Sequence, residues 1–378
     1  MSVWDGLVGQ ADAAAVLAGA VADAGAMTHA WLFTGPPGSG RSNAARAFAA
    51  ALQCPTGGCG TCPDCTTVLA GTHADVTVVT TERVQFAIEE VRALVGLAQR
   101  APSGGRWRVI VLEDADRMTE RTSNVLLKAI EEPPPRTVWL LCAPSPQDVV
   151  VTIRSRCRGV VLRTPPVADV VALLVERDGV DPAVADAAAR AAQSHIGLAR
   201  RLARDPEARA RRARTLELAA TIRGVGDAVL IAAELVEVAA AESAAATADR
   251  DAAERAELLH SLGAGDGKTL PPALRSQITQ LEKDQKRRAT RAQRDVLDRF
   301  LLDLLSLYRD VLVLQLGADV DLVNTTSDQH ARALAAASTP EQTIRRMDAI
   351  GAARTALAGN VAPLLAVEAM AVALRPQG

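Results

Sequence analysis

Aromatic residues are scarce in this chain of 378 residues, where they make up 2% of the composition against 49% for hydrophobic residues as a whole. The hydrophobic cores therefore have to be built from Ala, Val and Leu. Neither sign of charge is in excess, because 42 basic residues face 44 acidic ones and leave a net charge of −2. No overall field draws the protein towards nucleic acid or an anionic membrane.

Long apolar runs are also missing. No apolar stretch of about 18 residues is free of charge, so no helical membrane span is expected. The first five residues, MSVWD, have neither a basic start nor an apolar core, which predicts no signal peptide. We therefore expect a cytoplasmic protein with no membrane partner.

Cysteine is sparse, and four of the six cysteines are concentrated in one short segment, at Cys54, Cys59, Cys62 and Cys65. Gly and Pro lie between them, which predicts a knuckle over 54–65. Four thiolates at this spacing can close a tetrahedron around Zn²⁺ with no open position for a reacting water. Two disulfides or four free thiols are the alternatives, and disulfides are disfavoured without an export signal. The pattern predicts a structural zinc ion, while Cys142 and Cys157 are expected to be buried thiols.

The segment with the most distinctive chemistry is GPPGSGRS over 35–42. An apolar run precedes it and an Ala-rich helical pattern follows it. The segment matches the phosphate-binding pattern G-x-x-x-x-G-K-[ST] except that arginine replaces the lysine. Glycines let backbone N–H groups surround a phosphate, and the helix N-terminus adds partial positive charge. The candidate nucleotide-binding residues here are Gly35, Gly38, Gly40, Arg41 and Ser42.

The second half of such a site is an acidic pair after a neighbouring strand, where an Asp holds Mg²⁺ and a Glu orients water. The candidate pair follows the apolar run 109–112, but the acids occur in reverse order, as Glu113 and Asp114. A misplacement of about 1 Å can cost on the order of 100-fold in rate. Together with Arg41, these departures predict that hydrolysis is lost. Binding of ATP or ADP with Mg²⁺ but without turnover stays open, and the acids can also be a solvated strand end.

Short apolar segments alternate with helical patterns in the first part of the chain. Strands are predicted at 30–33, 75–79, 108–112, 138–143 and 159–162, and helices at 12–24, 42–52, 85–100, 120–131 and 146–154. This alternation predicts an α/β fold with a parallel sheet and helices on both faces. Thr164-Pro165-Pro166 marks a boundary. Beyond it the chain is expected to be all helical, with long helices at 229–246, 275–316 and 331–374 and a loop over 263–272.

Five motifs together resemble bacterial clamp-loader subunits, which are AAA+ proteins of the DNA polymerase III holoenzyme. They are VGQ at 8–10, HAWLFTGP at 29–36, the four cysteines, LLKAIEEPP at 126–134 and TIRSRC at 152–157. The resemblance is strong over 3–163 and implies an AAA+ P-loop domain over 1–165 that contains the zinc knuckle. It further implies a helical lid over 166–214, with Arg200 as a sensor candidate, and an all-helical collar for oligomerisation over 215–378.

Within that family, gamma/tau motor subunits carry an intact lysine and an Asp-Glu pair, whereas delta-prime subunits often carry a degenerate site. Arg41, Glu113 and Asp114 resemble the second kind. The resemblance implies a non-hydrolysing stator that assembles with gamma/tau and delta subunits and helps to load the sliding clamp on primed DNA. It also implies that Arg156 is an arginine finger for a neighbour's ATP; from spacing alone, Arg156 would be an ordinary basic residue before a strand. An ATP-hydrolysing motor of the gamma/tau type is the alternative.

Two basic runs could contact a DNA backbone. Their members are Arg200, Arg201, Arg204, Arg209, Arg211, Arg212 and Arg214 in the first run, and Lys283, Lys286, Arg287, Arg288, Arg291 and Arg294 in the second. A solvated helix face is the favoured interpretation of both. No aromatic residues lie among them, so base stacking is not supported. An independent zinc-containing nucleic-acid module is the weakest hypothesis, because the cysteines lie inside the predicted ATPase fold.

Overall fold

The computed structural model describes residues 2–81, 85–261 and 272–376, and the chain divides into two compact units, 1–204 and 205–378. The predicted division into three domains stays a prediction. Helices that follow residue 166 belong to the first unit as far as Arg204, and the second unit begins at Asp205. The loop predicted over 263–272 lies, except for Pro272, outside the described residues.

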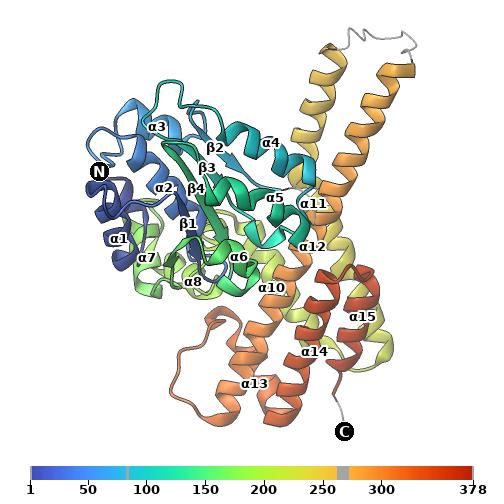
Figure 1. Cartoon of the computed structure of the whole chain (residues 1–378). Helices are drawn as coiled ribbons and strands as arrows, with labels where there is room; N and C mark the ends of the chain where they lie inside the picture. The colour runs from blue at the N-terminus through green and yellow to red at the C-terminus, as the bar shows by residue number, and fades with distance from the viewer. Residues whose placement is uncertain (1, 82–84, 262–271, 377–378) are drawn as a thin grey trace. The chain divides into compact units, whose positions relative to one another are not determined.

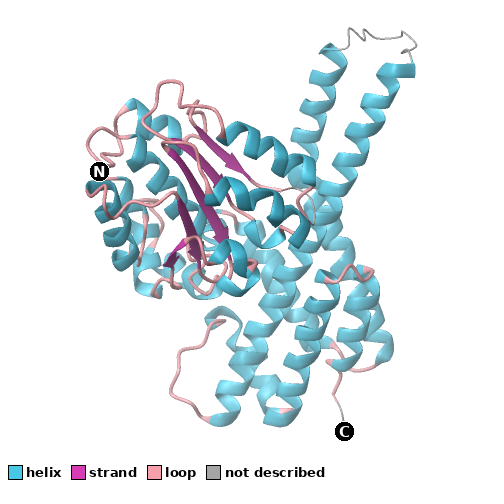
Figure 2. Ribbon diagram, in the orientation of Figure 1, coloured by secondary structure: helices cyan, strands magenta, loops and turns pink. Residues whose placement is uncertain are grey.

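The first unit contains a five-stranded parallel sheet with the order β2-β3-β4-β1-β5 (Figure 2). All five predicted strands are present, within one residue of the expected bounds. They are β1 (Ala30–Thr34), β2 (Val76–Val79), β3 (Arg108–Leu112), β4 (Thr137–Ala143) and β5 (Arg158–Val161). The predicted parallel α/β sheet is therefore confirmed. β1 lies between β4 and the edge strand β5, so the loop that follows β1 emerges one strand in from that edge.

Helices cover both faces of this sheet (Figure 1). Trp31 and Phe33 point into one hydrophobic core, and the alternate residue Leu32 points into the other. The first core is completed by α1 (Ala11–Ala22), α2 (Arg41–Gln53) and α3 (Pro63–Leu69), which follow the short 3₁₀ helix η1 (Val3–Gly6). The second core is completed by α4 (Ile88–Ala98), α5 (Glu120–Glu131) and α6 (Val151–Arg154).

Two expectations are corrected in this unit. The helix predicted over 146–154 is two short pieces, the 3₁₀ helix η3 (Pro146–Asp148) and α6, because Val149 is extended and buries its side chain in the second core. The few aromatic residues are central to the cores despite their small number. Trp31 packs edge-on against Phe48 with ring centroids 5.0 Å apart, and Trp139 is fully buried on the opposite face.

The first unit continues with three helices that pack on one another, α7 (Val167–Glu176), α8 (Pro182–Ala191) and α9 (Ile196–Arg204). Between α8 and α9, Gln193 and Ser194 have positive φ values of 48° and 62°. These two residues reverse the chain immediately before His195. The left-handed backbone at 193 and 194 therefore determines where His195 is placed.

The second unit is all helical in its described residues. It contains α10 (Pro206–Thr221), α11 (Val225–Ser261), α12 (Pro272–Leu316), η4 (Thr325–Ser327), α13 (Asp328–Ala336), α14 (Pro340–Ala358) and α15 (Pro363–Ala373). The long helix predicted over 331–374 is wrong, since the chain breaks before Pro340 and Pro363, each of which begins a new helix at its first turn. Within residues 2–81, 85–261 and 272–376, no helix combines the length and apolar character that crossing a membrane requires.

Candidate functional site

The glycine loop follows β1 and leads into α2, as its pattern predicts. Gly38 and Gly40 have φ values of 83° and 88°, in the left-handed region that favours glycine. Gly40 is also the residue immediately before α2, so the loop turns sharply into the helix. The strand–loop–helix frame of a phosphate-binding site is therefore present at Gly35–Ser42.

Arg41 is the first residue of α2, and its guanidinium Nη1 donates a hydrogen bond to the backbone carbonyl of Gly35. In a phosphate-binding loop, the cation at this position contacts the nucleotide phosphates. Here the guanidinium of Arg41 is instead hydrogen-bonded to Gly35, the first residue of the same loop. A planar guanidinium also differs from a compact ammonium in the geometry of its donors.

A second group fills space beside the loop. A Cβ atom built on Gly38 would lie 2.5 Å from the imidazole Cγ of His195 and 2.7 Å from its Cα, so His195 packs directly on the Gly38 peptide. Burial lowers the pKa of His195, and the positive charge of Arg41 lowers it further. The imidazole Nδ1 accepts a hydrogen bond from the backbone of Leu198 at 3.3 Å.

Sequence reasoning missed His195 as a site residue. A single histidine between two helices carries no pattern that connects it to a loop more than 150 residues earlier. The left-handed conformation of Gln193 and Ser194, which directs the chain there, has no glycine to signal it.

Gln10 belongs to one of the sequence motifs, and the structure gives it a definite position. Its amide Nε2 donates to the Ser39 carbonyl at 3.2 Å and to the Arg163 carbonyl at 2.6 Å, and its Oε1 accepts from the Arg163 amide at 3.1 Å. The side chain is buried. Gln10 thus links the start of the chain, the glycine loop and the segment after β5.

The two acids after β3 both have partners within the chain. Glu113 forms an ion pair with Arg46 of α2, with 2.9 Å between Oε1 and Nη2. The Asp114 carboxylate accepts a hydrogen bond from the Thr81 amide at 3.1 Å and lies 3.6 Å from Arg117. The structure therefore brings Glu113 to α2 through its ion pair with Arg46.

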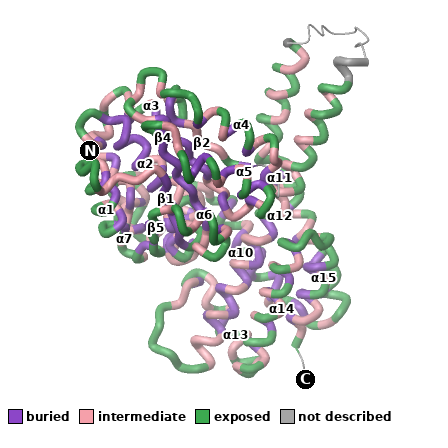
Figure 3. The backbone as a smooth tube through the Cα atoms, in the orientation of Figure 1, coloured by how far each residue is buried: buried purple, intermediate pink, exposed green. Residues whose placement is uncertain are grey.

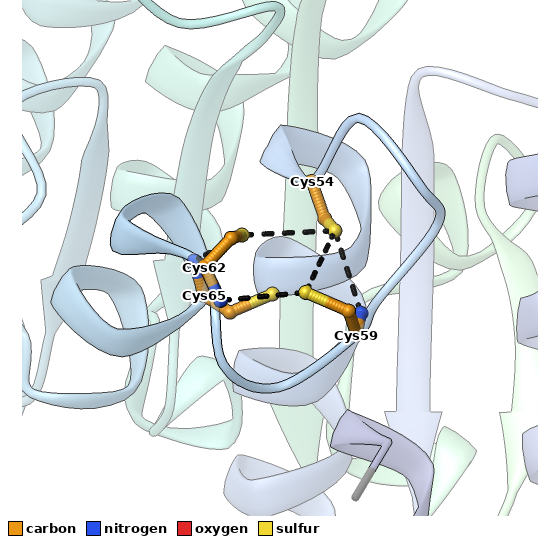
Figure 4. Close-up of side chains that lie close together, drawn as sticks. All are labelled: Cys54, Cys59, Cys62 and Cys65. Atoms are coloured by element: carbon orange, nitrogen blue, oxygen red, sulfur yellow. Dashed lines mark hydrogen bonds between the residues drawn. The ribbon is translucent and has the colours of Figure 1, made fainter.

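The four cysteines converge. Cys54 ends α2, Cys62 and Cys65 flank the start of α3, and Cys59 lies in the glycine-rich turn between the helices (Figure 4). All four sulfur atoms lie within 4.8 Å of one another. The Sγ of Cys54 is 3.7 Å from that of Cys59 and 3.8 Å from that of Cys62.

These separations fit a metal ion. Four sulfurs at about 2.3 Å from a tetrahedral zinc ion are roughly 3.8 Å apart, whereas a disulfide needs about 2.05 Å. Backbone amides of Cys59, Cys62 and Cys65 point at the sulfurs of Cys54, Cys59 and Cys62, at 3.4, 3.3 and 3.4 Å. Such N–H donors stabilise thiolates. The four cysteines are thus clustered in a way that can hold a metal.

The environment of the thiols differs from one to another. For Cys54, burial opposes ionisation, but hydrogen bonds from Thr56 and from the backbone of Cys59, Gly58 and Thr56 outweigh it and lower the pKa to about 5. Backbone hydrogen bonds from Thr61 and Cys62 lower the pKa of Cys59 to about 7. Burial instead raises the pKa of Cys65. Two acidic thiols of this kind favour the thiolate form that metals bind.

The lone cysteines are inert by comparison. Cys142 in β4 is buried as predicted, and burial raises its pKa to about 12. Cys157 is half-buried rather than buried, and burial raises its pKa to about 12 as well.

Arg156 lies in the turn between α6 and β5. Its Nη2 is 2.6 Å from Oε1 of Glu131 at the end of α5, and its Nη1 donates to the Thr152 carbonyl at 2.8 Å. The side chain is 39% exposed. It therefore lies at the surface of the first unit and is positioned by contacts within its own chain.

Arg200 on α9 points to a buried carboxylate. Its Nε is 2.7 Å from Oδ2 of Asp178, and Arg204 approaches Oδ1 of the same residue at 3.0 Å. Asp178 follows α7, so the two arginines join the first and third of these helices. Among the described residues, Arg200 forms no hydrogen bond or ion pair with the glycine loop.

A family profile matches the chain within the first unit. The profile of the family described as "DNA polymerase III, delta subunit" matches residues 9–166. The chain is 41% identical over 136 residues to the DNA polymerase III subunit delta' of Pseudomonas aeruginosa, which covers 34% of this chain and 41% of that protein. It is 34% identical over 182 residues to the gamma/tau subunit of Mycobacterium tuberculosis, which covers 46% of this chain and 31% of that protein.

The chain thus matches less than half the length of these relatives. Among solved structures, a variant of RuvB from Thermotoga maritima superposes with a TM-score of 0.40 and 17% identity, and covers 57% of this chain and 65% of that chain.

Proposed function

We propose that this chain is a member of the DNA polymerase III clamp-loader family, which the match over residues 9–166 supports. The chain is a delta-prime-type subunit that does not hydrolyse ATP. It acts in the cytoplasm as a stator, assembles with gamma/tau-type and delta-type subunits, and helps them to load a sliding clamp on primed DNA. The helical second unit supplies the collar through which the subunits associate.

The observation that carries this proposal is the pairing of charges around the glycine loop. The guanidinium of Arg41 is bonded to the loop's own Gly35 carbonyl, and Glu113 is bonded to Arg46. A catalytic P-loop needs its cation for the phosphates and its first acid for Mg²⁺. Both groups would have to give up a partner before they could serve a nucleotide, and Glu113 and Asp114 would still be in the reverse order.

The test has two parts. Mg-ATP binding and turnover are measured on the isolated chain, with an intact gamma/tau-type subunit as the positive control. We expect no turnover. The chain is then co-expressed with tagged gamma/tau-type and delta-type subunits, and stoichiometric co-purification is expected. ATP turnover by the isolated chain would contradict the proposal that it is a non-hydrolysing stator. Failure to co-purify with the other subunits would contradict the proposed clamp-loader role.

Arg156 is proposed as the arginine finger that acts on a neighbouring subunit's ATP. Its partial exposure and its position at the surface support this role. A guanidinium supplied in trans stabilises charge on the transferring phosphoryl group and is worth about 10³–10⁵ in rate. In this proposal Glu131 holds the guanidinium in place before assembly.

The measurement is ATPase of the assembled loader, stimulated by clamp and primed DNA. Arg156→Ala should lower the turnover contributed by the adjacent motor subunit on the order of 1,000-fold. Glu131→Gln removes the partner but keeps the guanidinium, and it should retain turnover within a few fold. Equal activity of Arg156→Ala and the unaltered loader rules out the finger.

The four cysteines are proposed to hold one structural Zn²⁺, with Cys54, Cys59, Cys62 and Cys65 as its ligands. The sulfur separations of 3.7 and 3.8 Å support it. Because all four ligands are thiolates, the ion has no open position and contributes to folding rather than to chemistry. Metal analysis of the purified chain should give one zinc per chain.

Arg200 is proposed to stabilise the three-helix segment α7–α9 rather than to sense a nucleotide. Its ion pair with the buried Asp178 supports this assignment. Arg200→Ala should lower the melting temperature and leave the ATPase of the assembled loader within a few fold. A large ATPase defect in a loader that remains assembled would restore the sensor role.

A gamma/tau-type motor is the second candidate, and one observation favours it. The Ser39 hydroxyl inside the loop is buried and has no hydrogen-bond partner among the described residues. Such a group can pair with a bound phosphate. Nucleotide titration separates the two candidates, because tight Mg-ATP binding with turnover supports the motor, and binding without turnover remains compatible with the stator.

A further inference from the structure

Helices α11 and α12 extend together beyond the other helices of the second unit (Figure 1). We call their outer part, residues 244–260 and 276–295, the arm. No residue of the arm is buried (Figure 3). At its base, Ser243, Val296 and Leu297 are buried. The arm is therefore a two-helix projection with no apolar core of its own.

Polar contacts between the two helices hold the arm together. Arg288 of α12, only 11% exposed, lies 2.6 Å from Asp251 and 2.5 Å from Glu254 of α11. Arg255 pairs with Glu282 at 2.9 Å. These contacts orient the helices about their axes, so each helix has a defined outward face.

The outward face of α12 is basic. Lys283, Lys286 and Arg287 are exposed and occur at i, i+3 and i+4, which places them on one side of the helix. Lys283 and Lys286 make no ion pair within the described part of the chain. Arg287 is 58% exposed and only reaches Asp284 one turn away, at 3.3 Å. Arg294 continues the same side, so the stripe is about 16 Å long at 1.5 Å per residue.

The other basic run does not resemble this stripe, because most of its charges are paired. Arg212 is buried against Asp303 at 2.7 Å, and Arg200 and Arg204 share Asp178. Arg211 and Arg214 also contact carboxylates, with Asp205 and Glu217 each at 3.3 Å. In the described part of the chain, the second run differs in that Lys283 and Lys286 have no ion pair and Arg287 has one exposed ion pair.

We propose that this stripe on the arm binds the phosphate backbone of duplex DNA. Charge complementarity favours DNA as the partner. A duplex presents about one negative charge per 1.7 Å of its axis, so the stripe can lie beside roughly nine phosphate charges. No large hydrophobic side chain of the arm is exposed, so an apolar docking site is not available there. The lack of aromatic residues excludes base stacking, which single-strand binding uses.

The choice of DNA as the anion rests on the proposed function. The opposite helix of the arm exposes Asp249 and Glu257. These acids would repel a duplex, so only the α12 side can face the DNA.

The experiment uses the full chain and a fluorescent 24-base-pair duplex of arbitrary sequence, at 50 and 200 mM NaCl. Each phosphate contact contributes a slope of about −0.9 in log K against log salt, so three contacts predict a roughly 40-fold loss of affinity between the two concentrations. Lys283→Ala/Lys286→Ala/Arg287→Ala should lower affinity at 50 mM by about tenfold or more and abolish most of the salt dependence. Far-UV circular dichroism confirms that the variant stays helical.

A matched control removes the same charge elsewhere in the second unit. Arg214→Ala/Arg332→Ala/Arg345→Ala should bind the duplex within about twofold of the unaltered chain, because counterion release depends on phosphate contacts and not on net charge. Equal losses in both triple variants overturn the proposal, as does an unaltered chain that fails to bind at 50 mM.

Tighter binding of poly-L-glutamate than of the duplex, at equal charge concentration, overturns DNA as the occupant. Co-purification with gamma/tau-type subunits is scored separately, so loss of the arm's role is distinguishable from failure of the clamp-loader role.

Discussion

The two ends of α2 carry the two candidate sites of the first unit, and they differ in how their polar groups are satisfied. At the N-terminal end, Arg41 is bonded to the Gly35 carbonyl, and one turn later Arg46 is bonded to Glu113. At the C-terminal end, the sulfurs of Cys54 and its three companions face one another, with backbone amides behind them.

The difference distinguishes a closed site from an open one. Groups that already have polar or charged partners inside the chain gain little from a ligand. Four converging thiols gain a great deal, because metal binding supplies the positive charge that their thiolate forms need. Whether the charged side chains of a site already have partners within the chain is thus a better guide to ligand binding than the presence of a familiar sequence motif.

Removing a cysteine of the cluster at the C-terminal end of α2 should lower the melting temperature more than any other change considered. Cys62→Ser removes one of the four proposed ligands, and we expect loss of the proposed zinc and a melting temperature lower by on the order of 10 °C, since structural zinc sites contribute several kcal/mol or more to folding. Zinc analysis and thermal denaturation check it. The control is Cys157→Ser, which alters a half-buried thiol outside the cluster and should keep the zinc.

The loop over 103–107 contacts the cysteine end of α2, because Arg106 donates to the Cys54 carbonyl at 3.0 Å, and this loop depends on a buried carboxylate. Asp75 accepts hydrogen bonds from the amides of Ser103, Gly104 and Gly105, at 2.7, 3.0 and 2.6 Å, and pairs with Arg108 at 2.9 Å. Asp75→Asn keeps the size but removes the charge, and should cost about 3 kcal/mol, or roughly 6–12 °C in melting temperature. Denaturant unfolding at pH 7 measures the loss.

The same residue predicts a pH dependence. Burial opposes the charge of Asp75, but the hydrogen bonds from 103–105 outweigh it and lower its pKa. A depressed pKa adds stability that is present above the ordinary value of about 4 and is lost as pH falls below it. The stability difference between the unaltered chain and Asp75→Asn should be constant from pH 5 to 8 and shrink below about pH 4. A difference that is unchanged at pH 3 contradicts this assignment.

Removing the ion pair of Arg46 at the N-terminal end of α2 should lower the free energy of unfolding by less. Arg46→Ala leaves Glu113 without its partner, and because the pair is only partly buried we expect a loss of about 1 kcal/mol. The matched control Arg121→Ala changes an exposed arginine on α5 and should be neutral within about 0.5 kcal/mol. Isothermal titration should find that Arg46→Ala binds Mg-ATP more tightly than the unaltered chain, because Glu113 is released.

The smallest effect should come from restoring the missing lysine. Arg41→Lys recreates the phosphate-binding pattern, yet we expect no measurable ATPase, because Glu113 and Asp114 remain reversed and Glu113 remains paired. Stability should change by less than about 0.5 kcal/mol. Turnover by this single variant would mean that the site is open after all, and the contrast between the two ends of α2 would fail.

Much of the first unit could be predicted from its sequence, because local patterns determine its elements. Each strand is a short apolar run, and the glycine loop and the cysteine knuckle each lie within a dozen residues. The break at Val149 could not be predicted, since the extended conformation there depends on burial in a core built by distant helices. In the second unit, the prolines at the breaks are visible in the sequence, but the apolar periodicity that continues across Pro340 and Pro363 hides them.

The pairing of charges was out of reach for sequence reasoning. Nothing in the chain between Arg46 and Glu113 indicates that they meet, because their contact depends on how α2 lies across the end of β3. The packing of His195 on Gly38 is of the same kind. Local patterns predict where a site begins, and tertiary contacts decide whether its groups are available.

The position of β1 between β4 and β5 has a consequence for synthesis of the chain. Ala30 pairs with Trp139, and Trp31 pairs with Arg158. At about 5–20 residues per second, β1 waits roughly 5–20 s on the ribosome before its first partner strand is made. The knuckle at 54–65 needs no later residue for its four thiols, so the proposed zinc ion can order the end of α2 while the glycine loop at its start still lacks a sheet.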